Sequence, residues 1–314
     1  MSTRHFLEID DVTPLELARI LALSQSEVGR PLAGLGVAIV LALPSSRTRN
    51  STEMATFDLG GHPITLSGSE LGIDSRETAE DIARTLAQYH RILSARVPDH
   101  AVLERMASAI DRQGFDVPVV NLLSDAGHPV QALADLLTLA DCIAAGDVAG
   151  LRGRSIAWIG DANNVARSLA LAAVGVGMAV RVASPTGYSF SALDVERVAA
   201  YADAAGLEGS MTVLGSPAEA VEGAGAICTD VWVSMGQEAE RALRVDAFAP
   251  FQVDERLLGA AGPNAALLHC LPAHRGEEVT DGALEGPQSR VWQQAAHRRT
   301  AMRGLFAWLV EEAS

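Results

Sequence analysis

Short apolar runs alternate with longer amphipathic stretches along the chain. The run at 36–43, GVAIVLAL, is unbroken, which is typical of a strand buried on both faces. Further runs of strand length occur at 62–66, 92–97, 117–122, 155–159, 178–183, 211–214, 226–229 and 265–269. The pattern therefore predicts a fold built on many short, buried strands.

Helical patterns separate most of these runs. Thr13-Pro14-Leu15-Glu16 forms a capping box with proline at the first helical position, so we expect a helix to begin at Pro14. A second helix is expected to follow the first strand through Asp58, where Gly60-Gly61 ends it. Helical spacing also covers 78–89, 129–144, 164–176 and 291–310, and the last of these is predicted to be long and amphipathic.

Strands that alternate with helices predict an α/β fold made of parallel βαβ units. The 314 residues suggest about two domains, and a glycine-containing break at 146–153 marks a boundary between them. We expect two doubly wound parallel-sheet domains, over 1–146 and 147–290, that bind ligands at the carboxyl ends of their strands.

Composition narrows the possible functions. Lys and Arg number 24 against 39 Asp and Glu, and the net charge of −15 argues against binding to nucleic acids or anionic membranes. The three cysteines, Cys142, Cys228 and Cys270, are too few and too scattered for a disulfide framework or a structural zinc site. No stretch fits a signal peptide or a membrane span, so we expect a cytoplasmic protein.

A cluster of hydroxyl and guanidinium groups follows the first strand. Ser45-Ser46-Arg47-Thr48-Arg49 opens a predicted helix, where free backbone N–H groups and the helix dipole attract anions. Arginine can grip phosphate oxygens bidentately, so a phosphate site is favoured over a merely polar helix start. The segment is not a Walker A loop, because it lacks the lysine and the glycine spacing.

His128 and Gln131 stand at the start of another helix, in Gly127-His128-Pro129-Val130-Gln131. A histidine can donate to a carbonyl oxygen whether it is neutral or protonated, and a glutamine amide can pair with another amide. The plainer alternative, which this segment alone favours, is a histidine that caps the helix.

Two strand ends in the second half carry polar groups. Gly160-Asp161-Ala162-Asn163-Asn164 stands where a dinucleotide fold has G-x-G-x-x-G, but Ala162 breaks that pattern. The adjacent asparagines suit a zwitterionic small molecule or a plain turn. In Asp230-Val231-Trp232-Val233-Ser234-Met235-Gly236, the carboxylate can hold an ammonium group, while Trp232 belongs either to a closing loop or beneath a surface loop.

His269-Cys270-Leu271-Pro272 ends the run at 265–269. Adjacent strand residues point to opposite faces, so His269 and Cys270 do not form a nucleophilic pair by themselves. A buried structural cysteine is the plainer interpretation. We do not expect a metal here without further ligands at zinc spacing.

Taken in order, these segments resemble the aspartate/ornithine carbamoyltransferase family, and its ornithine branch most closely. The segment at 45–49 is similar to the S-T-R-T-R carbamoyl-phosphate motif, and HPVQALADLLTL is similar to the H-P-x-Q-x-L-A-D-x-x-T block. WIGDANN, TDVWVSMGQE and HCLPAHRGEEVTD resemble the motifs of the acceptor domain. The similarity begins at RHFLEIDD and reaches the last helix, so it covers nearly the whole chain.

The resemblance implies one site for carbamoyl phosphate and one for an amino acid that accepts the carbamoyl group. The matches to carbamoyl-phosphate binders are Ser45, Ser46, Arg47, Thr48, Arg49, Arg96, His128, Gln131, Cys270, Leu271 and Arg298. The matches to acceptor binders are Asn164, Asp230, Ser234 and Met235. The catalytic roles fall on Arg96, His128, Asp230, Cys270 and Arg298.

The resemblance further implies that the helix at 291–314 returns to the first domain, that copies assemble as trimers or multiples of trimers, and that no metal or organic cofactor takes part. The implied reaction moves the carbamoyl group of carbamoyl phosphate to the δ-amine of L-ornithine and yields L-citrulline and phosphate, a step of arginine biosynthesis. Departures from the family pattern at Asn50, Arg167 and Ala296-His297 leave two alternatives open. One is a different acceptor, such as putrescine, an acylated ornithine or another diamino acid, and the other is a ligand-binding paralogue with weak activity.

Overall fold

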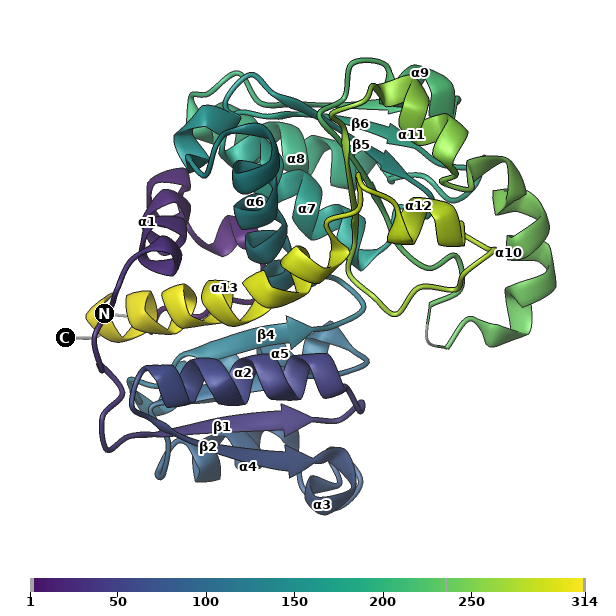
Figure 1. The fold of residues 1–314 in the computed structure, drawn as a ribbon. Helices are drawn as coiled ribbons and strands as arrows, with labels where there is room; N and C mark the ends of the chain where they lie inside the picture. The colour runs from purple at the N-terminus through teal and green to yellow at the C-terminus, as the bar shows by residue number, and fades with distance from the viewer. Residues whose placement is uncertain (1–2, 235, 313–314) are drawn as a thin grey trace. The chain divides into compact units, whose positions relative to one another are not determined.

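The structure is a computed structural model, and it describes residues 3–234 and 236–312 (Figure 1). The chain forms two compact units: unit 1 comprises Met1–Ala134 and Arg298–Ser314, and unit 2 comprises Asp135–His297. Two helices, α6 (Pro129–Ile143) and α13 (Val291–Glu312), contribute residues to both units. The assignment of one ligand to 1–146 and the other to 147–290 stays a prediction.

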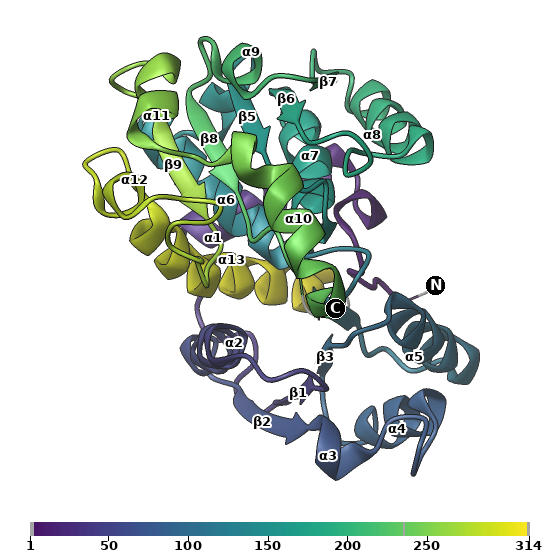
Figure 2. The same cartoon turned by 90° about the vertical axis from the view of Figure 1, so that its right-hand side faces the viewer.

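Unit 1 is built on a parallel sheet with the strand order β2-β1-β3-β4. Its strands are β1 (Gly36–Leu41), β2 (His62–Ser67), β3 (Ile92–Arg96) and β4 (Val119–Leu123). Its helices include η1 (Ile9–Asp11), α1 (Pro14–Gln25), α2 (Ser46–Asp58), α3 (Gly68–Leu71), α4 (Ala79–Leu86) and α5 (His100–Gln113). Figures 1 and 2 show α2 on one face of this sheet and α4 with α5 on the other, which is the doubly wound arrangement.

Unit 2 is built on a parallel sheet with the order β7-β6-β5-β8-β9. Its strands are β5 (Ser155–Ile159), β6 (Ala179–Ala183), β7 (Ser210–Leu214), β8 (Ala226–Thr229) and β9 (Ala266–His269). Its helices include η2 (Val148–Leu151), α7 (Asn164–Gly175), α8 (Ala192–Ala205), α9 (Pro217–Val221), η3 (Glu238–Glu240), α10 (Arg241–Phe248), η4 (Ala249–Phe251), α11 (Glu255–Ala261) and α12 (Asp281–Glu285). Figure 2 shows α7 and α8 on one side of the sheet and α9, α11 and α12 on the other.

The predicted fold class, two doubly wound parallel-sheet α/β domains, is confirmed. The predicted capping box is also present, because Thr13 Oγ1 accepts a hydrogen bond from Glu16 N while Glu16 Oε2 accepts one from Thr13 N. None of the helices in the described part of the chain is both long enough and apolar enough to cross a membrane.

The last helix returns to unit 1, as expected, but its predicted amphipathic character is wrong over its final turns. Arg299 Nε donates to Asp58 Oδ2 at 2.6 Å, and Arg303 Nη2 donates to the Ser24 carbonyl at 2.8 Å, so α13 is fastened to α2 and α1. Over residues 301–310 almost every side chain is buried. A helix that is enclosed on all sides is apolar on all sides, so its final turns lack the separate apolar and polar faces of an amphipathic helix.

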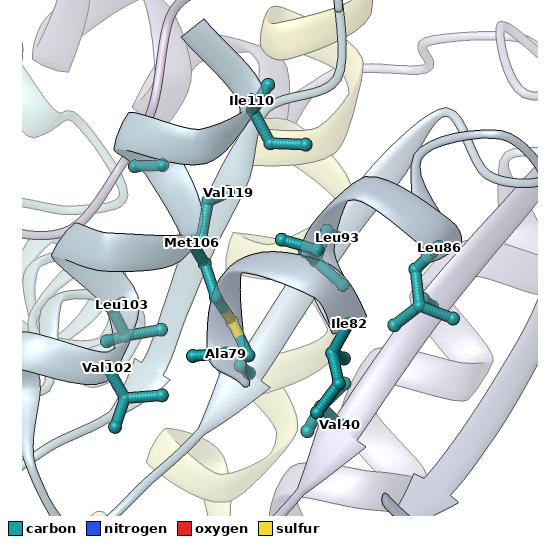
Figure 3. Close-up of a cluster of buried hydrophobic side chains, with 14 of the residues drawn as sticks. Val40, Ala79, Ile82, Leu86, Leu93, Val102, Leu103, Met106, Ile110 and Val119 are labelled. Carbon is teal, nitrogen blue, oxygen red and sulfur yellow. The ribbon is translucent and has the colours of Figure 1, made fainter. Parts of the chain in front are cut away.

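A cluster of buried side chains joins α4 and α5 to the sheet of unit 1. Figure 3 shows Ile82 and Leu86 from α4 and Leu103 and Met106 from α5 against Leu93 and its neighbours on the strands. Because this interior is closely packed, removal of one large side chain leaves a cavity that the surroundings fill only in part.

We expect Leu103→Ala to lower the free energy of unfolding by about 2–5 kcal/mol, because Leu103 is 0% exposed and its removal leaves a cavity. Leu15→Ala is the matched control, since Leu15 is 81% exposed and should change the free energy by about 0.5 kcal/mol or less. Urea unfolding followed by fluorescence measures both variants. Equal effects of the two substitutions would contradict the packing described here.

Candidate functional site

The carboxyl ends of β1, β3 and β4 lie at one edge of the unit 1 sheet, because neighbouring strands run in parallel. The chain leaving β1 leads to Ser45 and the start of α2, while Arg96 is the last residue of β3 and pairs in register with Leu41. His128 follows β4 and directly precedes α6. The topology thus brings together segments that are far apart in the sequence.

The start of α2 is a capped helix N-terminus. Ser45 Oγ accepts a hydrogen bond from Thr48 N at 3.2 Å, which leaves Ser46 and Arg47 in the first turn. Arg49 Nε instead donates to Glu53 Oε1 at 2.8 Å, so this guanidinium is held by a carboxylate of its own helix. The backbone donors of the first turn and the exposed Arg47 side chain form an anion-attracting surface.

His128 lies buried beside a buried arginine. Arg298 Nη1 donates to His128 Nε2 at 3.0 Å and to Gln131 Oε1 at 2.6 Å. Burial is the first cause that holds the pKa of His128 well below its usual value, and the positive charges of Arg298, Arg96 and Arg47 add to it. The imidazole is therefore neutral near pH 7, and because Nε2 accepts, its proton is on Nδ1.

The structure thus gathers many of the residues predicted for carbamoyl phosphate. Arg47, Arg96 and Arg298 all lie close enough to His128 to lower its pKa, and Gln131 shares a donor with it. The His128 side chain is engaged by α13, so it does more than cap α6. A donor on a neutral ring, surrounded by guanidinium groups, suits a ligand that joins a carbonyl to an anion.

A second set of polar groups lies at the carboxyl edge of the unit 2 sheet, where β5, β8 and β9 are neighbours. Asp230, just after β8, accepts hydrogen bonds from Asn163 Nδ2 at 2.9 Å and from Cys270 Sγ at 3.2 Å. The carboxylate is buried, and both of these donors are neutral. Neither cancels its charge, so the group is suited to hold an ammonium ion.

Both adjacent asparagines are candidates from the sequence, but the family resemblance assigns the acceptor contact to Asn164 and gives Asn163 no role. Asn163 Oδ1 caps α7 by accepting from Val165 N and Ala166 N, both at 3.0 Å, and its Nδ2 is the donor to Asp230. The preference of asparagine for the N-cap position was the signal that could have found it.

The Cys270 segment is fixed by its neighbouring histidine. His269 Nδ1 accepts from Leu271 N at 2.9 Å, and His269 Nε2 lies 3.0 Å from Glu278 Oε1. Leu271 has a φ of 60°, a left-handed conformation that costs a branched residue about 1–2 kcal/mol. Strain of this kind persists where surrounding contacts enforce it, and such positions cluster at functional sites.

A buried ion pair supports the segment that follows Asp230. Arg244 pairs with Asp161, its Nε donates to the Trp232 carbonyl at 2.6 Å, and its guanidinium lies 4.7 Å from the centre of the Tyr188 ring. Trp232 is buried and stacked on Phe248, which is the plainer of the two predicted roles for it. Neither Arg244 nor the ion-pairing role of Asp161 was foreseen.

The remaining predicted acceptor residues are only partly placed. Ser234 N donates to Gln237 Oε1 at 3.1 Å within a short turn. Met235 lies outside the described residues. Two departures from the family pattern are engaged by carboxylates, since Arg167 Nε donates to Asp194 Oδ1 at 2.9 Å and His297 Nε2 lies 3.0 Å from Asp141 Oδ2.

The fold and these side chains define a two-domain α/β protein, with a cluster of arginines around His128 in unit 1 and a buried carboxylate, Asp230, in unit 2. Residues 4–141 match the family described as "Aspartate/ornithine carbamoyltransferase, carbamoyl-P binding domain", and residues 152–309 match its "Asp/Orn binding domain". The chain belongs to the aspartate/ornithine carbamoyltransferase family.

Individual relatives agree with this membership. An ornithine carbamoyltransferase from Rhodococcus jostii is 43% identical over 316 residues, covering 98% of this chain and 96% of its own. The structure of an ornithine carbamoyltransferase from Pyrococcus furiosus matches with a TM-score of 0.88 and 40% identity, over 98% of this chain and 96% of that one. An acetylornithine transcarbamylase complexed with acetylcitrulline has a TM-score of 0.83 and 28% identity, over 97% and 98% of the two chains.

The Asp161–Arg244 pair should make unfolding depend on pH. Burial raises the pKa of Asp161 from 3.8 to about 6, against the opposing effect of Arg244. The folded state therefore holds this proton more tightly than the unfolded chain does. The stability it contributes is present below the unfolded pKa and is lost as the pH rises through about 6.

We therefore expect the free energy of unfolding of the unsubstituted protein to fall relative to Asp161→Asn by about 2–3 kcal/mol as the pH rises from about 4 to about 7. Asparagine is the appropriate comparison because it mimics the protonated acid and does not titrate. Urea unfolding at a series of pH values measures the difference. Parallel pH profiles for the two proteins would show that this carboxyl group does not titrate as described.

Proposed function

We propose that the protein transfers the carbamoyl group of carbamoyl phosphate to the δ-amine of L-ornithine, giving L-citrulline and inorganic phosphate. The observation that carries this proposal is the convergence of Arg47, Arg96 and Arg298 on a neutral, buried His128. Carbamoyl phosphate combines a phosphate dianion with a carbonyl group, and this arrangement offers cations for the first and a donor for the second.

On the donor side, the first turn of α2, from Ser45 through Thr48, would bind the phosphate together with Arg47. Arg49 would join them after exchanging its contact with Glu53. Neutralised phosphate is a better leaving group. Arg96 and the Nδ1–H of His128 would stabilise the negative charge that develops on the carbonyl oxygen. Gln131 and Arg298, which are hydrogen-bonded to each other, would orient the amide end of the ligand.

On the acceptor side, Asp230 would hold an ammonium group of the amino acid. The hydrogen bonds from Asn163 and Cys270 would fix the orientation of the Asp230 carboxylate. Asn164, Ser234 and Met235 are proposed as further contacts to the acceptor, and Cys270 and Leu271 are proposed to lie beside the reacting groups. The δ-ammonium group must lose a proton before its nitrogen can attack. The protein therefore either binds the deprotonated fraction of the amine or stabilises the deprotonated form.

The proposed reaction has two bond changes. The neutral amine nitrogen attacks the carbonyl carbon, and its electron pair forms the new C–N bond while the carbonyl oxygen becomes negative. The electron pair on that oxygen then re-forms the carbonyl double bond, the C–O bond to phosphate breaks, and inorganic phosphate leaves with the electron pair of the broken bond. The nitrogen releases a second proton. Positioning and preorganised charge therefore carry most of the acceleration.

We further propose that the protein acts in the cytoplasm, in arginine biosynthesis, as a trimer or a multiple of trimers. None of the three cysteines, all of which the structure describes, forms a disulfide, which fits a reducing compartment. The exposed apolar side chains of Met54 and Phe57 on α2 and of Ile64 on β2 give unit 1 a surface that a second copy could cover.

A panel of amines tests the proposed acceptor. We expect phosphate release with L-ornithine to exceed that with putrescine, N-acetylornithine and L-lysine, with one ureido product formed per phosphate. Phosphate release is measured colorimetrically and the product by mass spectrometry. Faster turnover of N-acetylornithine or putrescine would replace ornithine as the acceptor, and no turnover with any amine would overturn carbamoyl transfer itself.

Two adjacent arginines provide a matched test of the donor site. Arg298→Gln should lower kcat/KM for carbamoyl phosphate by about 100- to 1000-fold, because it removes a charged donor beside His128. Arg299→Gln makes the same change in charge one residue later, where the side chain pairs with Asp58, and should change kcat/KM by about twofold or less. Similar losses in both variants would mean that the effect comes from α13 packing and not from the site.

A further inference from the structure

A cluster of three side chains of types that bind metal ions lies outside the proposed donor and acceptor sites. His274, Glu277 and Glu278 belong to the unit 2 segment between β9 and α12, and one donor atom of each lies within 4.8 Å of the other two. His274 Nδ1 is 4.0 Å from Glu277 Oε2 and 4.0 Å from Glu278 Oε2. At that separation these atoms are too far apart to hydrogen-bond to one another.

The three atoms are buried, and among the described residues they have no hydrogen-bond partner. The Glu278 side chain is 0% exposed, and its unpartnered Oε2 lies 4.0 Å from His274 Nδ1. A buried carboxylate oxygen without a donor costs roughly 1–3 kcal/mol or more, so native proteins rarely leave one in that state. The arrangement suits a cation that all three atoms can contact at once.

The other oxygens of the two carboxylates are already fixed by neighbours. Glu278 Oε1 accepts from His274 N at 2.6 Å and lies 3.0 Å from His269 Nε2, while Glu277 Oε1 is paired with Arg241. Outer hydrogen bonds of this kind orient the ligands in protein metal sites. The turn itself is also closed, because Glu277 N donates to the His274 carbonyl at 2.9 Å.

We propose that His274 Nδ1, Glu277 Oε2 and Glu278 Oε2 form a binding site for a divalent transition metal ion such as Zn²⁺, Co²⁺ or Mn²⁺. One imidazole nitrogen and two carboxylate oxygens are the donor set that these ions accept, with water completing the coordination. Donors around tetrahedral zinc lie about 3.4 Å apart, so binding draws the three atoms slightly inward. The His274 and Glu277 side chains are 41% and 24% exposed, which gives an ion access and the side chains room to move.

This site departs from the sequence expectation that no metal is bound, which rested on the lack of further ligands at zinc spacing around Cys270 and on the family resemblance. It is separate from the proposed reaction, and it does not depend on that proposal. The metal site is nevertheless connected to the Cys270 segment through hydrogen bonds. Glu278 contacts His269, and His269 Nδ1 accepts from the backbone of Leu271.

A competing cluster, Asp230 with His269 and Cys270, also has donor atoms within 4.8 Å of one another. There the atoms are already engaged: Asp230 accepts from Asn163 and from the Cys270 thiol, and both ring nitrogens of His269 have partners. An ion at this cluster would have to replace hydrogen bonds that exist, whereas an ion at His274, Glu277 and Glu278 would fill positions that have none.

Titration of the chelator-treated full chain with Co²⁺ tests the proposal, with calorimetry for stoichiometry and visible absorption for ligand type. We expect one Co²⁺ per chain, weak d–d bands and no intense thiolate charge-transfer band. His274→Gln and Glu277→Gln should each weaken binding by about tenfold or more, since even the loss of an outer partner of a metal ligand typically costs 10–100-fold. Both side chains are partly exposed, so both variants should fold, and circular dichroism checks this.

Two controls make the result specific. Glu285→Gln removes the same charge from a carboxylate that pairs with Arg275, in the same part of unit 2, and should leave Co²⁺ affinity unchanged. Cys270→Ser should also leave it unchanged. A thiolate band that disappears in Cys270→Ser would place the ion at the competing cluster and overturn the proposal. Absence of binding, or binding equally strong in Glu277→Gln, would overturn it as well.

Discussion

Every strand of both sheets runs parallel to its neighbours, so all carboxyl ends of a sheet lie at one edge. Residues that are remote in the sequence become neighbours only through this constraint. In unit 1 it brings Arg96 and His128 to the start of α2, and in unit 2 it brings Asp230 to Cys270 and Asn163. Loops can then carry charged and strained groups, because the buried strands beneath them supply the stability.

Burial of charge shapes both units, with opposite results. In unit 1, burial and the charges of three arginines lower the pKa of His128, so a side chain that could be cationic stays neutral near pH 7. In unit 2, burial makes the Asp161 carboxyl harder to ionise even though Arg244 is its partner. Arg244 also donates a hydrogen bond to the Trp232 carbonyl, so the Asp161–Arg244 pair holds the segment after Asp230 in one conformation.

The sequence was sufficient for the order of strands along the chain and for the strand-end segments, because buried parallel strands have a strong apolar signature. Short helices such as α9 and α12 span too few turns for periodicity to reveal them. The candidate site residues came from motifs, which is why His128 was proposed although its own segment favours a plain helix cap, and why Asn164 was matched to the acceptor binders and Asn163 was not. Arg244 escaped because an arginine in a helix normally indicates a solvated face, and only the fold shows that this one is buried.

The net charge of −15 and an anionic ligand are compatible because arginines in this chain have different partners. Arg105 is bound by Asp74 and Glu80, and Arg299 by Asp58, so their charges are cancelled where they stand. Arg298 donates instead to the side chains of His128 and Gln131, both of which are neutral. Because a charge in a poorly solvated position acts on an anion far more strongly than an exposed charge does, the position of an arginine matters more for anion binding than the net charge of the whole chain.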